Sequence, residues 1–195
     1  MKILALNVSK SFGEQPVLRD VSFTVPEGGT LVLTGDSGSG KTTLLRILLG
    51  LERADSGEIR FEERAPASFG VVFQEDRLVE TTTALENIRM IHKKSGRPSD
   101  DEIRAALLEL LPEESLKLPV SQFSGGMKRR LAVVRAMLSR SEVLVMDEPL
   151  SGLDEENREK VLAFIRKHQL NRPLVLTAHD MDDLTGYEEY RIPVL

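Results

Sequence analysis

The alternation of apolar and polar residues predicts a chain built from short strands and helices. Val21, Phe23 and Val25 alternate with polar residues, and this period of two predicts a strand with one buried face. Short continuous apolar runs elsewhere are typical of strands buried on both faces. The predicted strands cover residues 2–8, 17–25, 30–34, 58–61, 69–73, 143–146 and 174–176, and residues 190–195 alternate like a last edge strand.

Residues 76–135 differ from the rest of the chain, because they show helical spacing and no convincing strand. Ser99 is followed three residues later by Glu102, which predicts a capping box at a helix start, and Pro112 predicts the end of that helix. Strands alternate with helices on both sides of this block. The pattern therefore predicts an α/β fold with a mostly parallel sheet. We expect a single domain over residues 1–195, with an α/β core (1–75 and 136–195) and a helical subdomain at about 76–135.

Composition narrows the class of protein without identifying it. The net charge of −5 argues against a nucleic-acid surface, and the absence of cysteine excludes disulfides and cysteine-based metal sites. No apolar run approaches the roughly 18 residues that a membrane span requires. The apolar part of the N-terminus is too short for a signal peptide. We therefore expect a cytoplasmic protein.

One stretch carries a strong chemical signal, since it reads G-x-x-x-x-G-K-T between an apolar run and a predicted helix. Its residues are Gly35, Asp36, Ser37, Gly38, Ser39, Gly40, Lys41 and Thr42, followed by Thr43. Glycines allow a tight turn whose N–H groups converge on one anion, and the helix N-terminus adds its own. Lys41 would reach the β- and γ-phosphates of a nucleotide, and the Thr42 hydroxyl would ligate Mg²⁺. The alternative is a chance glycine turn before a core helix.

An acidic pair follows the apolar strand at 143–146. The carboxyl ends of parallel strands are where such sheets bind ligands, which places Asp147 beside the phosphate loop. Asp147 would then hold Mg²⁺, directly or through water, and Glu148 would polarise an attacking water molecule. The alternative is a solvated acidic turn after a strand.

Two further polar residues follow predicted strands. Gln74 could sense Mg²⁺ or the attacking water, although polar residues are also common at strand ends. His179 follows the strand at 174–176 and could form a hydrogen bond to the γ-phosphate. A lone histidine is more often structural, and this alternative stays open.

Ser124, Gly125 and Gly126 predict a second bare helix N-terminus, because a serine N-cap is followed by two glycines. A second anion site in one chain suggests that two chains share two nucleotides. On this motif alone a plain helix start would be the better interpretation.

These motifs, taken in order, closely resemble the ATP-binding cassette ATPases of ABC transporters over essentially the whole chain. They are GDSGSGKT (35–42), Gln74, FSGGM (123–127), VLVMDEP (143–149), SGLD (151–154) and His179. The resemblance implies a P-loop NTPase fold, with a RecA-like core sheet, an antiparallel β subdomain and an inserted helical subdomain. The signature differs from the usual LSGGQ, while its serine and glycines are intact.

The resemblance also implies a role for each motif. Phe12 would stack on adenine, where the family more often has tyrosine, and residues 35–43 would cradle the phosphates. Gln74 would couple the γ-phosphate and Mg²⁺ to the helical subdomain, Glu148 would be the catalytic base and His179 the switch. Residues 124–126 would clamp the γ-phosphate bound to the opposite subunit.

The implied function is ATP hydrolysis, with Mg²⁺, that drives a transporter. The expected partners are a second copy or a homologous cassette, membrane permease subunits and an extracytoplasmic substrate-binding protein, with no nucleic acid. The chain would lie on the cytoplasmic face of the membrane through its permease. SGGM and FQEDRL (73–78) also resemble importer cassettes of the nitrate, sulfonate and taurine type. The alternatives are a soluble non-transport ABC-type ATPase, a small-molecule kinase and an inactive cassette.

Overall fold

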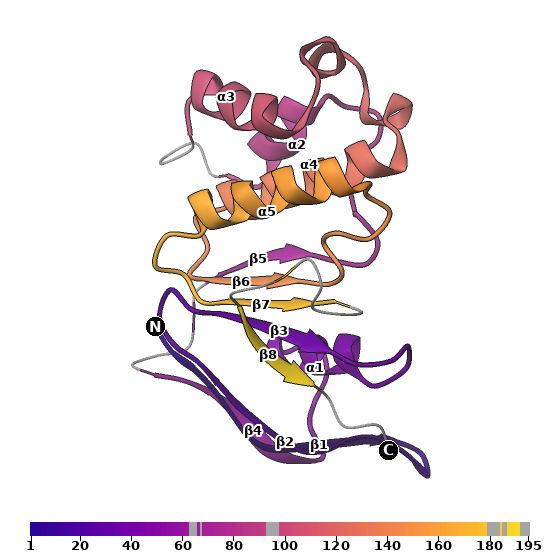
Figure 1. Cartoon of the computed structure of the whole chain (residues 1–195), viewed down its shortest axis with the longest axis vertical. Helices are drawn as coiled ribbons and strands as arrows, with labels where there is room; N and C mark the ends of the chain where they lie inside the picture. The colour runs from indigo at the N-terminus through magenta and orange to yellow at the C-terminus, as the bar shows by residue number, and fades with distance from the viewer. Residues whose placement is uncertain (63–65, 67, 93–97, 179–183, 185–186, 192–195) are drawn as a thin grey trace. The chain divides into compact units, whose positions relative to one another are not determined.

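The computed structural model describes residues 1–62, 66, 68–92, 98–178, 184 and 187–191. Packing divides the chain into two compact units. The core unit comprises Met1–Phe69, Ser141–Glu148 and Asn171–Leu195, and the helical unit comprises Gly70–Arg140 and Pro149–Leu170. Figure 1 shows their helices and strands.

The core unit contains an antiparallel sheet and a parallel one. The antiparallel sheet has the order β2-β1-β4, and the parallel strands follow the order β6-β7-β3-β8. The elements of this unit are β1 (Ile3–Phe12), β2 (Gln15–Val25), β3 (Thr30–Thr34), α1 (Lys41–Leu48), β4 (Ser56–Phe61), β6 (Val143–Met146), β7 (Leu174–Thr177) and β8 (Glu188–Arg191). The predicted parallel sheet and antiparallel β subdomain are both present.

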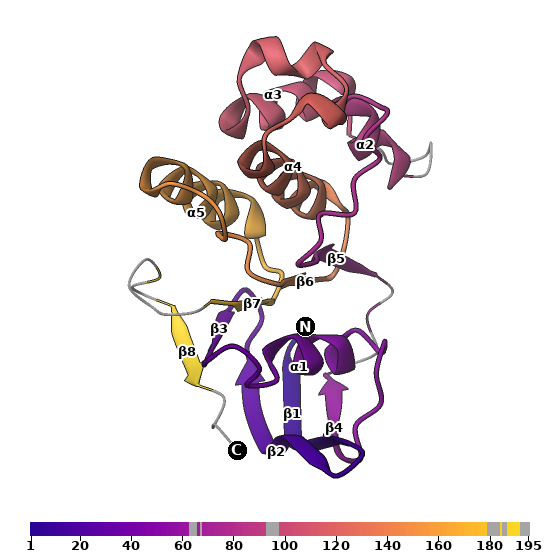
Figure 2. The same ribbon diagram turned by 90° about the vertical axis from the view of Figure 1, so that its right-hand side faces the viewer.

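Helix α1 shares one apolar core with both of these sheets. Its buried Leu44, Leu45 and Leu48 pack in a cluster with residues of β1, β2, β3, β6 and β7. Figure 2 shows α1 lying over β1 and β4. Full burial of a leucine side chain contributes about 1.5–3 kcal/mol, so this packing fixes the helix firmly. The loop that precedes α1 is therefore held at a defined place.

Three of the predicted strands are longer in the structure. Strands β1 and β2 extend toward each other past the predicted limits of 8 and 17, because Phe12 pairs with Gln15 in a tight hairpin whose turn is confined to Gly13 and Glu14. Strand β4 begins at Ser56, before the predicted start at 58. A Cβ on Gly57 would lie 2.2 Å from the carbonyl oxygen of Asn7, so this glycine allows β4 to approach β1 closely.

The helical unit contains the remaining elements. They are α2 (Ala84–Met90), α3 (Asp100–Leu110), the 3₁₀ turns Glu113–Lys117 and Val120–Gln122, α4 (Gly125–Leu138) and α5 (Glu155–Gln169), together with most of β5 (Phe69–Val72). The capping box at Ser99 and Glu102 is confirmed, and α3 ends just before Leu111 and Pro112. Helix α5 falls in this unit, outside the limits predicted for a helical subdomain. The division into one domain with a helical insertion stays a prediction.

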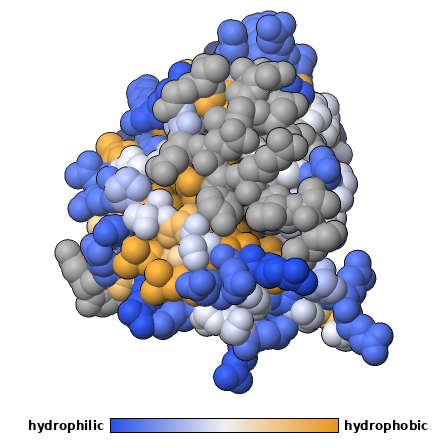
Figure 3. Space-filling model, turned by 60° about the horizontal axis from the view of Figure 1, so that its bottom comes forward, coloured by the Kyte–Doolittle hydropathy of each residue, from blue (hydrophilic) through white to orange (hydrophobic). Residues whose placement is uncertain are grey.

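Some apolar surface remains exposed on the core unit. Leu6, Phe12 and Leu51 are 36%, 51% and 55% exposed, and Figure 3 shows hydrophobic surface in the middle of the face it displays. Within the described part of the chain, no helix is both long and apolar enough to cross a membrane.

Candidate nucleotide site

The loop between β3 and α1 has the backbone geometry of a phosphate cradle. Gly38 and Gly40 adopt φ values of +85° and +94°, which side-chain-bearing residues rarely reach. A Cβ on Gly40 would also lie 2.7 Å from Leu18 Cδ2 and 2.8 Å from the carbonyl oxygen of Val17. Only glycine fits there, so the sequence pattern and the local structure agree.

Lys41 begins α1 and turns back over this loop. Its side chain is buried, and its Nζ donates to the carbonyl oxygens of Gly35 (2.5 Å) and Asp36 (3.0 Å). Helix α1 has no side-chain cap and no acidic residue in its first turn. The ammonium group, the free N–H groups and the positive end of the helix dipole therefore gather where an anion would bind.

The Ser39 hydroxyl is a further polar group of this loop. Its Oγ is buried and has no hydrogen-bond partner among the described residues. An unpaired buried hydroxyl is costly, so buried polar groups are nearly always satisfied. Asp36, Ser37 and Gly38 are exposed around it, and Thr43 is half-buried in the first turn of α1. The loop thus fits a phosphate group that would accept from the Ser39 hydroxyl.

Asp147 follows β6 and is held by two threonines. Its Oδ2 accepts from Thr42 Oγ1 and its Oδ1 accepts from Thr177 Oγ1, both at 2.8 Å. The carboxylate is buried. A hydroxyl and a carboxylate in contact supply the hard oxygen ligands that Mg²⁺ prefers, so Thr42 and Asp147 fit that ion. The structure brings these two predicted ligands together.

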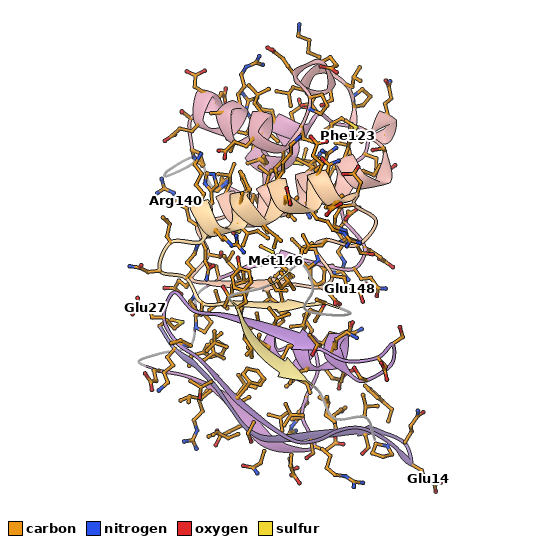
Figure 4. All side chains as sticks on the ribbon, viewed as in Figure 1. Glu14, Glu27, Phe123, Arg140, Met146 and Glu148 are labelled. Carbon is orange, nitrogen blue, oxygen red and sulfur yellow. The ribbon has the colours of Figure 1, made fainter. Side chains whose placement is uncertain are left out.

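Sequence analysis missed Thr177, the last residue of β7. The signal was a polar residue at the carboxyl end of an apolar strand, and its role becomes visible only from its hydrogen bonds. It donates to Asp147 and accepts from the backbone N–H of Glu148 (2.8 Å). Glu148 adopts a φ of +49° and is half-buried. Figure 4 shows Glu148 beyond the end of the strand, whereas Met146 lies among the strands.

Phe12 lies at the tip of the β1–β2 hairpin with half of its surface exposed. Lys10 Nζ lies 5.2 Å from the ring centroid, in cation–π range. This ammonium also pairs with Glu52 (3.0 Å) and Asp55 (3.2 Å), and the pKa of Lys10 is raised, chiefly by the hydrogen bond to Glu52. The ring is therefore held by its neighbours and still open to a planar group.

In the helical unit, two arginines of α4 hold the segment that contains Gln74. Arg129 donates to the carbonyl oxygens of Phe73 (2.8 Å) and Gln74 (2.6 Å). Arg135 donates to those of Asp76 (2.8 Å) and Arg77 (2.7 Å). Burial raises the pKa of Asp76, and the charges of Arg129 and Arg135 oppose that shift. The Gln74 segment is thus tied to α4 through its own backbone.

The predicted helix start at Ser124 is confirmed. Ser124 Oγ accepts from the N–H of Met127 (3.2 Å), and both Ser124 and Gly125 are exposed. A Cβ on Gly125 would meet nothing within 4 Å, whereas one on Gly126 would lie 3.3 Å from Leu153 Cδ2. The beginning of α4 is therefore an open surface.

The predicted site residues fall into three groups. Residues 35–43, Asp147 and Glu148 lie in the core unit, where Thr42 contacts Asp147. Gln74 and residues 124–126 lie in the helical unit. His179 lies outside the described residues, so its role stays a prediction. No cluster of three or more His, Cys, Asp or Glu suited to a metal occurs in the described ranges.

Comparison with known proteins agrees with this geometry. Residues 18–151 match the family model described as "ABC transporter". The sulfate/thiosulfate import ATP-binding protein CysA of Escherichia coli (strain K12) is 36% identical over 202 residues, which cover 95% of this chain and 55% of that protein. The chain therefore spans about half the length of the curated relatives it matches.

Solved structures show the same fold. A putative ABC transporter ATP-binding protein from Pyrococcus furiosus superposes with a TM-score of 0.87 at 22% identity, over 98% of both chains. A dimeric ATP-binding cassette in a post-hydrolysis state, bound to ADP and Pi, superposes with a TM-score of 0.81 at 27% identity, over 97% of this chain and 94% of that one. The predicted P-loop NTPase fold is confirmed.

Proposed function

Since the chain belongs to the ABC transporter family, we propose that it binds and hydrolyses ATP as the ATP-binding subunit of a membrane transporter. The observation that carries this proposal is the contact between Thr42 and Asp147 beside a glycine loop that contains Lys41. That arrangement combines an anion cradle with a pair of Mg²⁺ ligands.

Each residue of the site would have its own role in ATP hydrolysis. Lys41 and the N–H groups of the loop would bind the β- and γ-phosphates, and the Ser39 hydroxyl would donate to one of their oxygens. Thr42 and Asp147 would hold Mg²⁺, which when bound neutralises charge on the phosphates. Glu148 would accept a proton from water as the water oxygen bonds to the γ-phosphorus. The bond to the bridging oxygen then breaks and leaves ADP and phosphate.

The proposal gives a role in nucleotide binding to three further residues, Phe12, Gln74 and His179. The exposed ring of Phe12 would stack on the adenine base, with Lys10 behind it. Gln74 would couple the γ-phosphate and Mg²⁺ to the helical subdomain. His179 would form a hydrogen bond to the γ-phosphate.

We further propose that two cassettes share two nucleotides. Residues 124–126 form an open helix N-terminus that would bind the γ-phosphate held by the opposite subunit. The dimeric cassette bound to ADP and Pi among the structural neighbours supports this arrangement. Loss of the γ-phosphate on hydrolysis would remove the bridge, so the dimer would open.

The partners of such a subunit would be membrane permease subunits, which would hold it at the cytoplasmic face of the membrane. An extracytoplasmic substrate-binding protein would complete an importer. Relatives described as import ATP-binding proteins support this proposal, and their sulfate or thiosulfate specificity makes an oxyanion the first substrate to test.

Glu148→Gln tests the central step. The change keeps the shape of the side chain and removes its basicity, so ATP should still bind while hydrolysis falls by about a hundredfold or more. Size-exclusion chromatography with light scattering should then show an ATP-dependent dimer, with ATP and EDTA together as the control. A Glu148→Gln protein that hydrolyses ATP at the unaltered rate would contradict the proposal, and one that stays monomeric at saturating Mg·ATP would contradict the shared sites.

A further inference from the structure

Thr177 connects the two acidic residues of the site through a single hydroxyl group. Its Oγ1 lies 2.8 Å from Asp147 Oδ1 and 2.8 Å from the backbone nitrogen of Glu148. The side chain is 1% exposed and ends β7, which pairs with β6 directly before the acidic pair. No solvent competes for these bonds.

The two bonds of Thr177 are chemically compatible. A hydroxyl has one hydrogen, which Thr177 gives to the carboxylate, and lone pairs, one of which accepts the N–H of Glu148. Each bond polarises the hydroxyl in the sense that strengthens the other. The hydroxyl therefore has one orientation that satisfies both acidic residues at once.

The bond to Asp147 determines which way that carboxylate faces. With Oδ1 occupied by Thr177, the other oxygen, Oδ2, is directed at Thr42 Oγ1. Without the Thr177 hydroxyl, the carboxylate would lose a buried donor and could rotate about its χ2 torsion.

The bond to Glu148 acts on the backbone. A φ of +49° is sparsely populated for a residue with a side chain, and it persists only where surrounding contacts hold it. The Thr177 hydroxyl is such a contact, because it accepts the N–H of this residue. The backbone conformation in turn sets the direction in which the Glu148 side chain leaves the chain.

We propose that Thr177 is a positioning residue, whose hydroxyl orients the Mg²⁺ ligand Asp147 and the base Glu148 together. This inference rests on the proposed function of those two acids. In this proposal Thr177 acts through its two neighbours, to which its hydroxyl is bonded.

The first test compares Thr177→Val with Thr177→Ser. Valine keeps the shape and the preference for a buried strand but removes the hydroxyl, whereas serine keeps the hydroxyl. Thr177→Val should lower kcat about tenfold or more and raise KM for Mg·ATP about tenfold, because the base and the Mg²⁺ ligand are both misdirected, and Thr177→Ser should retain most of the unaltered kcat and KM. Thr24→Val, at an exposed position of β2, is the matched control and should leave kcat unchanged.

The second test does not depend on turnover. In a Glu148→Gln background, ATP affinity is measured by calorimetry in Mg²⁺ and in EDTA. Thr177→Val should weaken binding by about tenfold in Mg²⁺ and by less than about twofold in EDTA, because only the Mg²⁺ ligand is misdirected. Thermal unfolding of each variant shows that it is folded at the assay temperature.

Either of two results would overturn the inference: equal kcat for the valine and serine variants, or equal loss of affinity with and without Mg²⁺. Failure of the proposed function has a separate signature. In that case Asp147→Asn and Glu148→Gln would themselves retain hydrolysis, whatever Thr177→Val does.

Discussion

Helices α1 and α4 begin differently from the other three α-helices of the described residues. The first turn of α2 contains Glu86, that of α3 contains Asp100, Asp101 and Glu102, and that of α5 contains Glu155 and Glu156, whereas α1 and α4 have no acidic residue there. A carboxylate in the first turn neutralises the positive end of the helix dipole. The chain's own carboxylates thus neutralise the N-termini of α2, α3 and α5, whereas α1 and α4 have no such carboxylate, which agrees with the anion binding proposed for them.

The two open helix starts also differ from each other. Helix α1 follows Gly40, which is locked by its φ of +94° and by contact with β2, and it begins with the buried Lys41. Helix α4 follows an exposed serine cap and begins with Gly125, an exposed glycine with free space around it. The start of α1 is built into a core, while the start of α4 is an exposed surface, which under the proposed function a second subunit would cover.

The largest effect is expected when the cation of the α1 site is removed. Lys41→Ala should lower ATP hydrolysis by about a hundredfold or more, because a preorganised charge on the phosphates is lost. Arg46→Ala, at an exposed position of the same helix, should stay near the unaltered rate. Steady-state kinetics on both variants make the measurement, and equal rates for the two would remove Lys41 from the proposed mechanism.

A pair of glycine substitutions should separate the two helix starts. Gly40→Ala should lower the free energy of unfolding by about 2 kcal/mol or more, since it combines a strained φ with contacts under 3 Å. Gly125→Ala should change it by less than about 0.5 kcal/mol, because a Cβ there meets nothing. Urea unfolding measures both.

The rate of ATP hydrolysis by Gly125→Ala tests whether a phosphate binds at the start of α4. If the start of α4 closes on a phosphate of another subunit, this stable variant should still lose activity and ATP-dependent dimerisation. Full activity would show that no ligand approaches Gly125.

Ser124 allows capping to be separated from anion binding. Ser124→Ala should cost about 1 kcal/mol of stability through loss of the bond from the Met127 N–H. Ser124→Asp should keep the cap and the stability, yet its charge would repel a phosphate and lower ATP hydrolysis. A Ser124→Asp variant that is both stable and fully active would show that α4 begins as an ordinary helix.

The smallest effect is expected at the start of α3, where Glu102 forms a capping box with Ser99. Hydrogen bonds from the backbone N–H and the hydroxyl of Ser99 hold the pKa of Glu102 below its ordinary value of 4.5. This stabilisation is present above pH 4.5 and is lost as the pH falls through the lowered pKa. Glu102→Gln should therefore lower the melting temperature slightly at pH 7, and the difference should disappear toward pH 3. A difference that is constant with pH would exclude this cause.

Local features of the fold could be predicted because they depend on neighbouring residues. The capping box joins positions only three apart, Ser99 and Glu102, so the local sequence was enough to predict it. Strand extent was harder to predict. The β1–β2 hairpin closes at Phe12 and Gln15, and Gly57 lies within β4, since both depend on the partner strand rather than on the segment's own sequence.

The phosphate loop could be predicted from the sequence alone. Eight consecutive residues contain its glycines, Lys41 and Thr42, so backbone freedom and charge lie in one segment whatever surrounds it. The sequence predicted Asp147 beside this loop, but its bond to Thr42, 105 residues away, and its second bond, from Thr177, are seen only in the folded structure. These contacts follow from the strand order β6-β7-β3 and its register, which opposes Leu33 to Thr177 and Met146 to Leu176. Register is set by packing between distant strands, and no single segment encodes it.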